Sequence, residues 1–309
     1  MKRLRVLFSL AFLVALSGLC TAACSAQDWA KATLAKSPRH GEYVSIKEPG
    51  GRVLQAWVVY PEVKDKAPVV VMIHEIFGLS DWAREMADEV AGAGYIVVEP
   101  DLLSGFGPPM TDMSATTKST PAATPQAPMD HMHPQDNGSA FMAMSPGGTA
   151  AFPDQDAVVK AVSSLDPAQV LTDLDAAADY GKKQAASNGK LYVAGFCWGG
   201  GKSFAFATHR RDLTAAFVFY GPPPPADAMK NITAPVYGFY AGKDARITAT
   251  IPQTVIDMKA AYKKYDAVTY DGAGHGFMRA GEAPDASAEN AAARAGGFRR
   301  LIELMGGMR

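Results

Sequence analysis

The fold is decided by the stretch Lys190-Leu191-Tyr192-Val193-Ala194-Gly195-Phe196-Cys197-Trp198-Gly199-Gly200. Its centre, Gly195 to Gly199, has the form G-x-S-x-G with cysteine in the place of serine. The apolar residues before it are typical of a strand, and the small residues that follow, from Gly200 to Ala207, predict a turn that enters a helix. A strand, a sharp turn and a helix form the context of a nucleophile elbow. The glycines permit the tight turn, and a thiol held at its tip indicates covalent acyl transfer.

Working outward from this elbow, predicted strands and helices alternate along the chain. Val69 to His74 and Tyr95 to Val98 are nearly continuous apolar runs, as expected of buried parallel strands. Tyr43 to Glu48 and Val53 to Tyr60 alternate apolar and polar residues and predict an antiparallel pair. Further strands are expected at 214–220, 235–240 and 267–270, and helices at 81–93 (with Ser80 as N-cap), 154–165, 167–186 (with Pro167 in its first turn), 251–262 and 286–304. The fold class is therefore α/β, with a mostly parallel sheet covered by helices on both faces.

Four reactive side chains each follow a predicted strand directly, namely Glu75, Cys197, Asp244 and His275. In parallel sheets such positions meet at the carboxyl edge, where binding sites form. The order nucleophile, acid, histidine is that of α/β-hydrolases. We expect Cys197 to attack a carbonyl, His275 to take and return a proton, and Asp244 to orient the imidazole. The alternatives without catalysis are that Cys197 is buried and inert, that His275 is an ordinary loop residue, and that Asp244 only stabilises its turn. His209 is expected to be a surface residue at a helix end.

These motifs resemble the dienelactone hydrolase family of α/β-hydrolases. The resemblance extends roughly from Gly41 to Leu304, and it rests on His74-Glu75-Ile76-Phe77-Gly78-Leu79, Glu99-Pro100-Asp101-Leu102, Gly195-Phe196-Cys197-Trp198-Gly199-Gly200, Gly242-Lys243-Asp244 and Gly274-His275-Gly276-Phe277. It implies a catalytic triad of Cys197, Asp244 and His275.

The resemblance also implies roles for residues around the triad. Glu75 would lie beside the thiol and help turn it into thiolate once substrate is bound; the alternative is an ion-paired residue at a strand end. The backbone N–H groups of Ile76 and Trp198 would form the oxyanion hole. Arg279 matches an arginine that holds the substrate carboxylate in the family, although it could also be a solvated loop residue. A second family arginine is missing from Asp101-Leu102-Leu103-Ser104-Gly105, which leaves open whether the substrate is acidic.

The N-terminus has the three parts of a secretory signal peptide. A basic start is followed by the apolar run Val6 to Leu19 and by small residues up to Ala26. Cleavage after Ala26 would export the protein, in bacteria to the periplasm, and leave Cys197 as the only cysteine. Acylation of Cys24 in a lipoprotein is the alternative. No later segment is long and apolar enough to span a membrane.

Residues 105–153 interrupt the alternation of strands and helices. They are rich in Pro, Ser, Thr, Gly, Ala and Met, and predict an insertion or lid within one hydrolase domain that covers residues 27–309. Methionines together with His131 and His133 could ligate copper, but their spacing fits no defined site, so no metal is expected.

The formal net charge of −1 gives no support for nucleic-acid binding. We therefore expect an exported hydrolase of a small ester or lactone that needs no cofactor. Its oligomeric state stays open. The alternatives are a non-hydrolytic binding or thiol-sensing protein on the same fold, and an exported metal-binding protein that works through the insertion.

Overall fold

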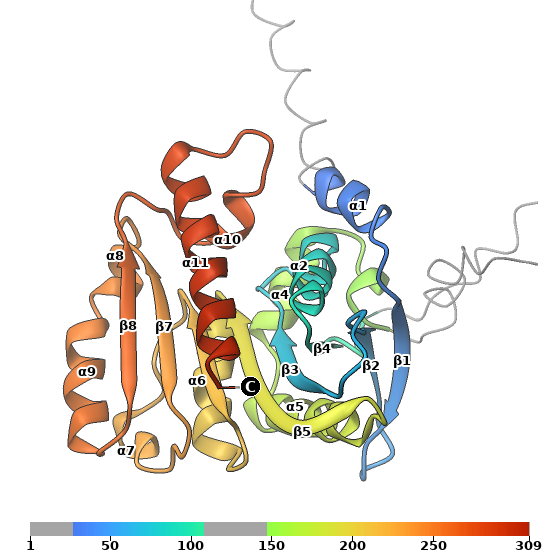
Figure 1. Cartoon of the computed structure of the whole chain (residues 1–309), viewed down its shortest axis with the longest axis horizontal. Helices are drawn as coiled ribbons and strands as arrows, with labels where there is room; N and C mark the ends of the chain where they lie inside the picture. The colour runs from blue at the N-terminus through green and yellow to red at the C-terminus, as the bar shows by residue number, and fades with distance from the viewer. Residues whose placement is uncertain (1–26, 108–146, 309) are drawn as a thin grey trace, which may run out of the picture.

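The computed structural model describes residues 27–107 and 147–308, which form one eight-stranded sheet (Figure 1). The strand order is β1-β2-β4-β3-β5-β6-β7-β8. β1 pairs with β2, and β2 with β4, antiparallel, while every later pairing is parallel. The strands are β1 (Gly41–Lys47), β2 (Val53–Val59), β3 (Ala67–Ile73), β4 (Ile96–Asp101), β5 (Ser187–Phe196), β6 (Ala215–Phe219), β7 (Val236–Ala241) and β8 (Tyr265–Tyr270). The predicted α/β class and the antiparallel N-terminal pair are confirmed.

Helices cover both faces of the sheet (Figure 1). Apolar residues of α4 (Gln155–Ser163), α5 (Pro167–Lys183), α6 (Trp198–His209), α7 (Ala226–Met229) and α9 (Ile251–Ala260) share one core cluster with one face of the sheet. A second cluster on the other face contains residues of α1 (Asp28–Leu34), α2 (Asp81–Gly92), α10 (Phe277–Ala280) and α11 (Ala288–Gly306). Two short helices, η2 (Thr149–Ala151) and α8 (Ala245–Thr248), lie in connections. Strands β3 and β4 contribute to both clusters, which explains their continuous apolar sequences.

Helix starts follow the expected local chemistry. The Ser80 side chain accepts a hydrogen bond from the backbone of Ala83 and caps α2, and Pro167 occupies the first turn of α5. The short helices α1, α7, α8 and α10 were not predicted. Each has four to seven residues, too few turns for an amphipathic period to be recognised.

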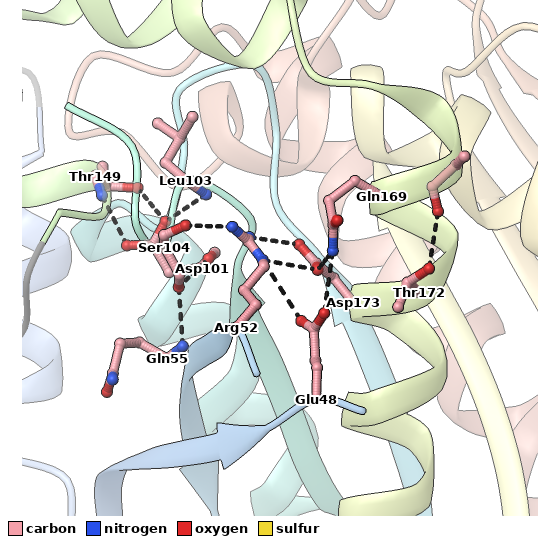
Figure 2. A network of polar contacts seen from close by, with 11 residues as sticks. Glu48, Arg52, Gln55, Asp101, Leu103, Ser104, Thr149, Gln169, Thr172 and Asp173 are labelled. Atoms are coloured by element: carbon pink, nitrogen blue, oxygen red, sulfur yellow. Dashed lines mark hydrogen bonds and ion pairs between the residues drawn. The ribbon is translucent and has the colours of Figure 1, made fainter. Parts of the chain in front are cut away.

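A buried ion-pair network ties β2 to α5 on the carboxyl side of β4 (Figure 2). The Arg52 guanidinium donates to both carboxylate oxygens of Asp173, at 3.2 and 2.8 Å, and to the backbone carbonyl of Ser104 at 2.6 Å. Glu48 lies 3.5 Å from Arg52, and its pKa is raised, first by burial and then by Asp173. Gln169 donates to both carboxylates, so every member of the network has a partner.

Asp101 holds together the two described ends that flank residues 108–146. Its carboxylate accepts hydrogen bonds from Leu103 N–H at 3.1 Å, Thr149 N–H at 2.7 Å and the Thr149 hydroxyl at 2.9 Å (Figure 2). Ser104 and Gly147 form an isolated antiparallel bridge beside it. Asp101 of the Glu99-Pro100-Asp101-Leu102 motif therefore has a structural role in this chain.

Two sequence predictions fall mainly outside the described residues. The signal peptide at 1–26 and the Met/His-rich stretch with His131 and His133 are not described, so both remain predictions. Within 27–107 and 147–308, no helix combines the length and the apolar character needed to cross a bilayer.

Candidate active site

Cys197 lies at the turn between β5 and α6. Its backbone adopts φ 56° and ψ −115°, a conformation that L-residues rarely take and that here lifts the thiol out of the strand. The turn closes tightly because glycines flank it. A Cβ on Gly195 would collide with the carbonyl of Gly199, and a Cβ on Gly199 would collide with the carbonyls of Ile73 and His74. The elbow pattern in the sequence thus corresponds to a strained turn that only glycine permits on both sides.

His275 lies between the thiol and Asp244. Its Nε2 is 3.0 Å from Cys197 Sγ, and its Nδ1 is 2.5 Å from Asp244 Oδ2. Since an ionised carboxylate only accepts hydrogen bonds, Nδ1 carries a proton. The bond to Cys197, followed by the bond to Asp244, raises the pKa of His275 to about 9, against an opposing effect of burial. The raised pKa makes this imidazole a stronger proton acceptor than a free histidine.

Asp244 is fixed by the helix that follows it. It caps α8, and its carboxylate accepts the Ile247 N–H at 3.4 Å through Oδ1, which leaves Oδ2 for His275. The Asp244 side chain is 7% exposed and that of His275 is 34% exposed. The acid is therefore buried and oriented, while the imidazole remains accessible.

Glu75 lies at the same edge of the sheet, but its carboxylate is engaged elsewhere. Oε2 accepts a hydrogen bond from Arg279 Nε at 2.7 Å, and Oε1 accepts one from the Tyr220 hydroxyl at 3.3 Å. Burial raises the pKa of Glu75, and the Arg279 charge partly opposes that rise. Among the described contacts, none joins Glu75 directly to Cys197. In this state Glu75 matches the ion-paired alternative for its role, and Arg279 is its partner.

Tyr220 is a site residue that the sequence did not reveal. It is fully buried, adopts φ 39°, and packs the edge of its ring against His275 with the centroids 5.1 Å apart. Tyr220 was predicted to be the last residue of a strand, yet β6 ends at Phe219, one residue earlier. Its position directly after a parallel strand, before Gly221-Pro222, is the signal that was available.

The two segments that carry the candidate oxyanion donors, the loop after β3 and the start of α6, both contact His74. Trp198 is the first residue of α6, so its backbone N–H has no hydrogen-bond acceptor within the helix. Ile76 follows Glu75 in the loop after β3. His74 Nδ1 is 2.7 Å from the Glu75 carbonyl, and its ring stacks on Trp198 with centroids 5.8 Å apart and planes at 10°. Burial lowers the pKa of His74, so the ring is neutral and packs between both segments.

One carboxylate cluster outside this site has the spacing of metal ligands. Single oxygens of Glu85, Glu89 and Glu282 lie within 4.8 Å of one another. The Arg294 guanidinium contacts both Glu89 and Glu282, so the cluster already contains a positive charge. His209 ends α6, where it is 43% exposed and pairs with Asp175.

The sheet order, the elbow after β5, and the acid and histidine after β7 and β8 together define an α/β-hydrolase. The chain belongs to the dienelactone hydrolase family, whose model matches residues 54–308. Membership in that family makes it an ester or lactone hydrolase by class.

Known proteins similar to this chain agree with the family match. A "Putative carboxymethylenebutenolidase" of Salmonella typhi is 28% identical over 239 residues, covering 74% of each chain. The carboxymethylenebutenolidase of Pseudomonas putida is 26% identical over 239 residues, covering 77% of this chain and 86% of its own. A crystal structure of a "Putative Dienelactone Hydrolase" from Klebsiella pneumoniae superposes with a TM-score of 0.64 at 25% identity, over 86% of this chain and 97% of that one.

Proposed function

We propose that this protein hydrolyses a small ester or lactone through a thioester on Cys197. The proposal rests on two hydrogen-bond contacts that share His275: Cys197 Sγ is 3.0 Å from Nε2, and Asp244 Oδ2 is 2.5 Å from Nδ1. A nucleophile within hydrogen-bond reach of a base that is itself oriented by an acid can form a covalent intermediate.

The chemistry divides into two halves. His275 takes the thiol proton, the Cys197 sulfur bonds to the substrate carbonyl carbon, and the N–H groups of Ile76 and Trp198 stabilise the oxyanion. When that intermediate collapses, the C–O bond breaks and His275 returns the proton to the leaving alkoxide. In the second half His275 takes a proton from water, and the resulting hydroxide attacks the thioester. The C–S bond breaks, the acid leaves, and Cys197 recovers its proton.

Glu75 and Arg279 would regulate the thiol in this scheme. Arg279 uses Nε for Glu75, and its other N–H groups can donate to a bound substrate. A substrate that engages Arg279 weakens its hold on Glu75. The freed carboxylate, whose pKa burial raises, can then accept the thiol proton first and pass it to His275, so that one proton leaves Cys197 and ends on the imidazole.

The test is turnover of a panel of small lactones and aryl esters by wild type and Cys197→Ala. We expect loss of turnover in the variant and an acyl-enzyme mass adduct on Cys197 in quenched wild type. The control is Tyr262→Ala, at an exposed position just after the end of α9. Undiminished turnover by Cys197→Ala would exclude this nucleophile. Alkylation of the thiol without turnover of any substrate would favour a thiol-sensing protein instead.

We also propose that the protein is exported after cleavage following Ala26. The support is the basic, apolar and small-residue pattern of the first 26 residues. Mass spectrometry of the mature protein should give a chain that begins at Gln27. A lipid-modified N-terminus at Cys24 would establish the lipoprotein alternative.

A further inference from the structure

A cavity of about 820 Å³ lies beside Arg279, outside the triad itself. Its walls come from α1, from the C-terminal end of α10 and from the connection to α11, and they include Asp28, Trp29, Arg279, Ala283, Pro284 and Asp285. In Figure 1 these elements lie above the carboxyl ends of the strands, the edge that carries the active site. The volume falls within the range of small-molecule sites.

Arg279 joins this cavity to Glu75 and to the loop that follows β3. It lines the cavity, donates from Nε to Glu75, and places its guanidinium 4.8 Å from the centre of the Phe77 ring. Phe77 follows Ile76, one of the two candidate oxyanion donors. A group bound in the cavity would therefore lie next to the arginine that pairs with Glu75.

Both walls of the cavity are anchored to α2. On one side, the Gln27 side chain accepts the Trp82 backbone N–H at 3.1 Å, and Ala30 is fully buried in the core cluster of α2. On the other side, Glu282 accepts the Trp82 indole N–H at 2.8 Å. Since α2 supports both walls, the cavity is preformed, which lowers the ordering cost of binding.

The chemistry of the walls selects the bound group. Trp29, Ala283 and Pro284 present apolar surface, and the indole offers a face for stacking. The charge of Arg279 is already balanced by Glu75. Asp28 and Asp285 add two negative charges to the walls, against the one positive charge of the Gln27 amino group in a chain cleaved after Ala26. The cavity is thus unfavourable for an anionic group and favourable for an uncharged aromatic one.

We propose that this cavity binds an uncharged aromatic group of the ester or lactone, and that Trp29 determines the preference. The proposal rests on the proposed hydrolysis at Cys197. Trp29 precedes the part of the chain that matches the family model, which begins at residue 54.

The experiment compares kcat/KM for phenyl acetate, ethyl phenylacetate and ethyl acetate in wild type, Trp29→Ala and Trp29→Phe. We expect Trp29→Ala to lose about tenfold on at least one aromatic ester while its activity on ethyl acetate changes less than twofold. Trp29→Phe should restore most of the loss. The loss should appear mainly in KM, because the triad is intact. Tyr262→Ala is the matched control for removal of an aromatic side chain elsewhere.

A second arm tests the charge of the walls. Asp28→Asn with Asp285→Asn should improve the activity on 4-carboxyphenyl acetate, relative to phenyl acetate, by about three- to fivefold at low salt. The proposal is overturned if Trp29→Ala lowers activity equally on all three uncharged esters, or if the aspartate variants leave the charge preference unchanged. Failure of the hydrolytic function is distinguished from both results, because wild type would then turn over none of these esters.

Discussion

Removing the Arg279 guanidinium should make the stability of the protein depend more steeply on pH. Arg279 pairs with Glu75 at 2.7 Å, and the two side chains are 28% and 3% exposed. At an effective dielectric constant of about 20, unit charges about 4 Å apart attract by roughly 4 kcal/mol. Solvent around the arginine and the desolvation of Glu75 reduce this value, so we expect Arg279→Gln to lower the free energy of unfolding by about 2 to 3 kcal/mol at pH 8.

The sign of the pH dependence follows from Glu75. Burial already raises its folded pKa, and loss of the arginine raises it further. Below the pKa of a glutamate in the unfolded chain, about 4.3, Glu75 is protonated in both the folded and the unfolded state. In that pH range Arg279→Gln therefore loses little free energy of unfolding through Glu75. As pH rises, the unfolded chain releases the proton first, so the stability of the variant falls relative to wild type.

Urea unfolding at pH 5 and pH 8 measures this difference. We expect a deficit below about 1 kcal/mol at pH 5 and about 2 to 3 kcal/mol at pH 8. The control is Glu75→Gln combined with Arg279→Gln, which should remove most of the added pH dependence. A deficit of equal size at both pH values would show that Arg279 stabilises by packing and not by balancing the charge of Glu75.

Three further changes have defined outcomes. Asp244→Asn should lower kcat by about 10³- to 10⁴-fold with little change in melting temperature, since it disturbs the tautomer of His275; steady-state kinetics would contradict this with a loss below tenfold. Arg52→Leu should lower the free energy of unfolding by about 3 kcal/mol in urea, because Asp173 is left buried without its cation, and adding Asp173→Asn should recover part of it. Gly199→Ala should lower the melting temperature strongly and reduce soluble yield, since its Cβ meets two backbone carbonyls; a stable, active variant would refute the packing argument.

Much of this architecture could be predicted from local sequence patterns. The runs of β3 and β4 are apolar along their length because they are buried on both faces, and the elbow is recognisable because glycine must flank it. The order of Cys197, Asp244 and His275 then places three side chains at one edge of the sheet. In the structure His275 lies within hydrogen-bond distance of both Cys197 and Asp244.

The remaining features depend on contacts between distant parts of the chain. Glu75 and Arg279 are 204 residues apart, and no periodicity shows that one balances the charge of the other. Tyr220 was not recognised as a site residue because the predicted strand included it, whereas β6 ends one residue earlier. Helix α1 is too short to be recognised from periodicity, and its contribution to a cavity appears only when α2 brings it near the α10–α11 connection.

The bridge between Ser104 and Gly147 has a practical consequence for protein engineering. The backbone N–H of Gly148 donates to the carbonyls of Leu103 and Phe106 at 3.0 and 3.1 Å, so the two described segments that end at residue 107 and begin at residue 147 lie side by side. A short linker could therefore join these positions, and each halving of the loop reduces the entropic cost of closure by about 0.6 kcal/mol. The same junction is a site where an affinity tag, a fluorescent reporter or a second binding module could be grafted without cutting any of the eight described strands.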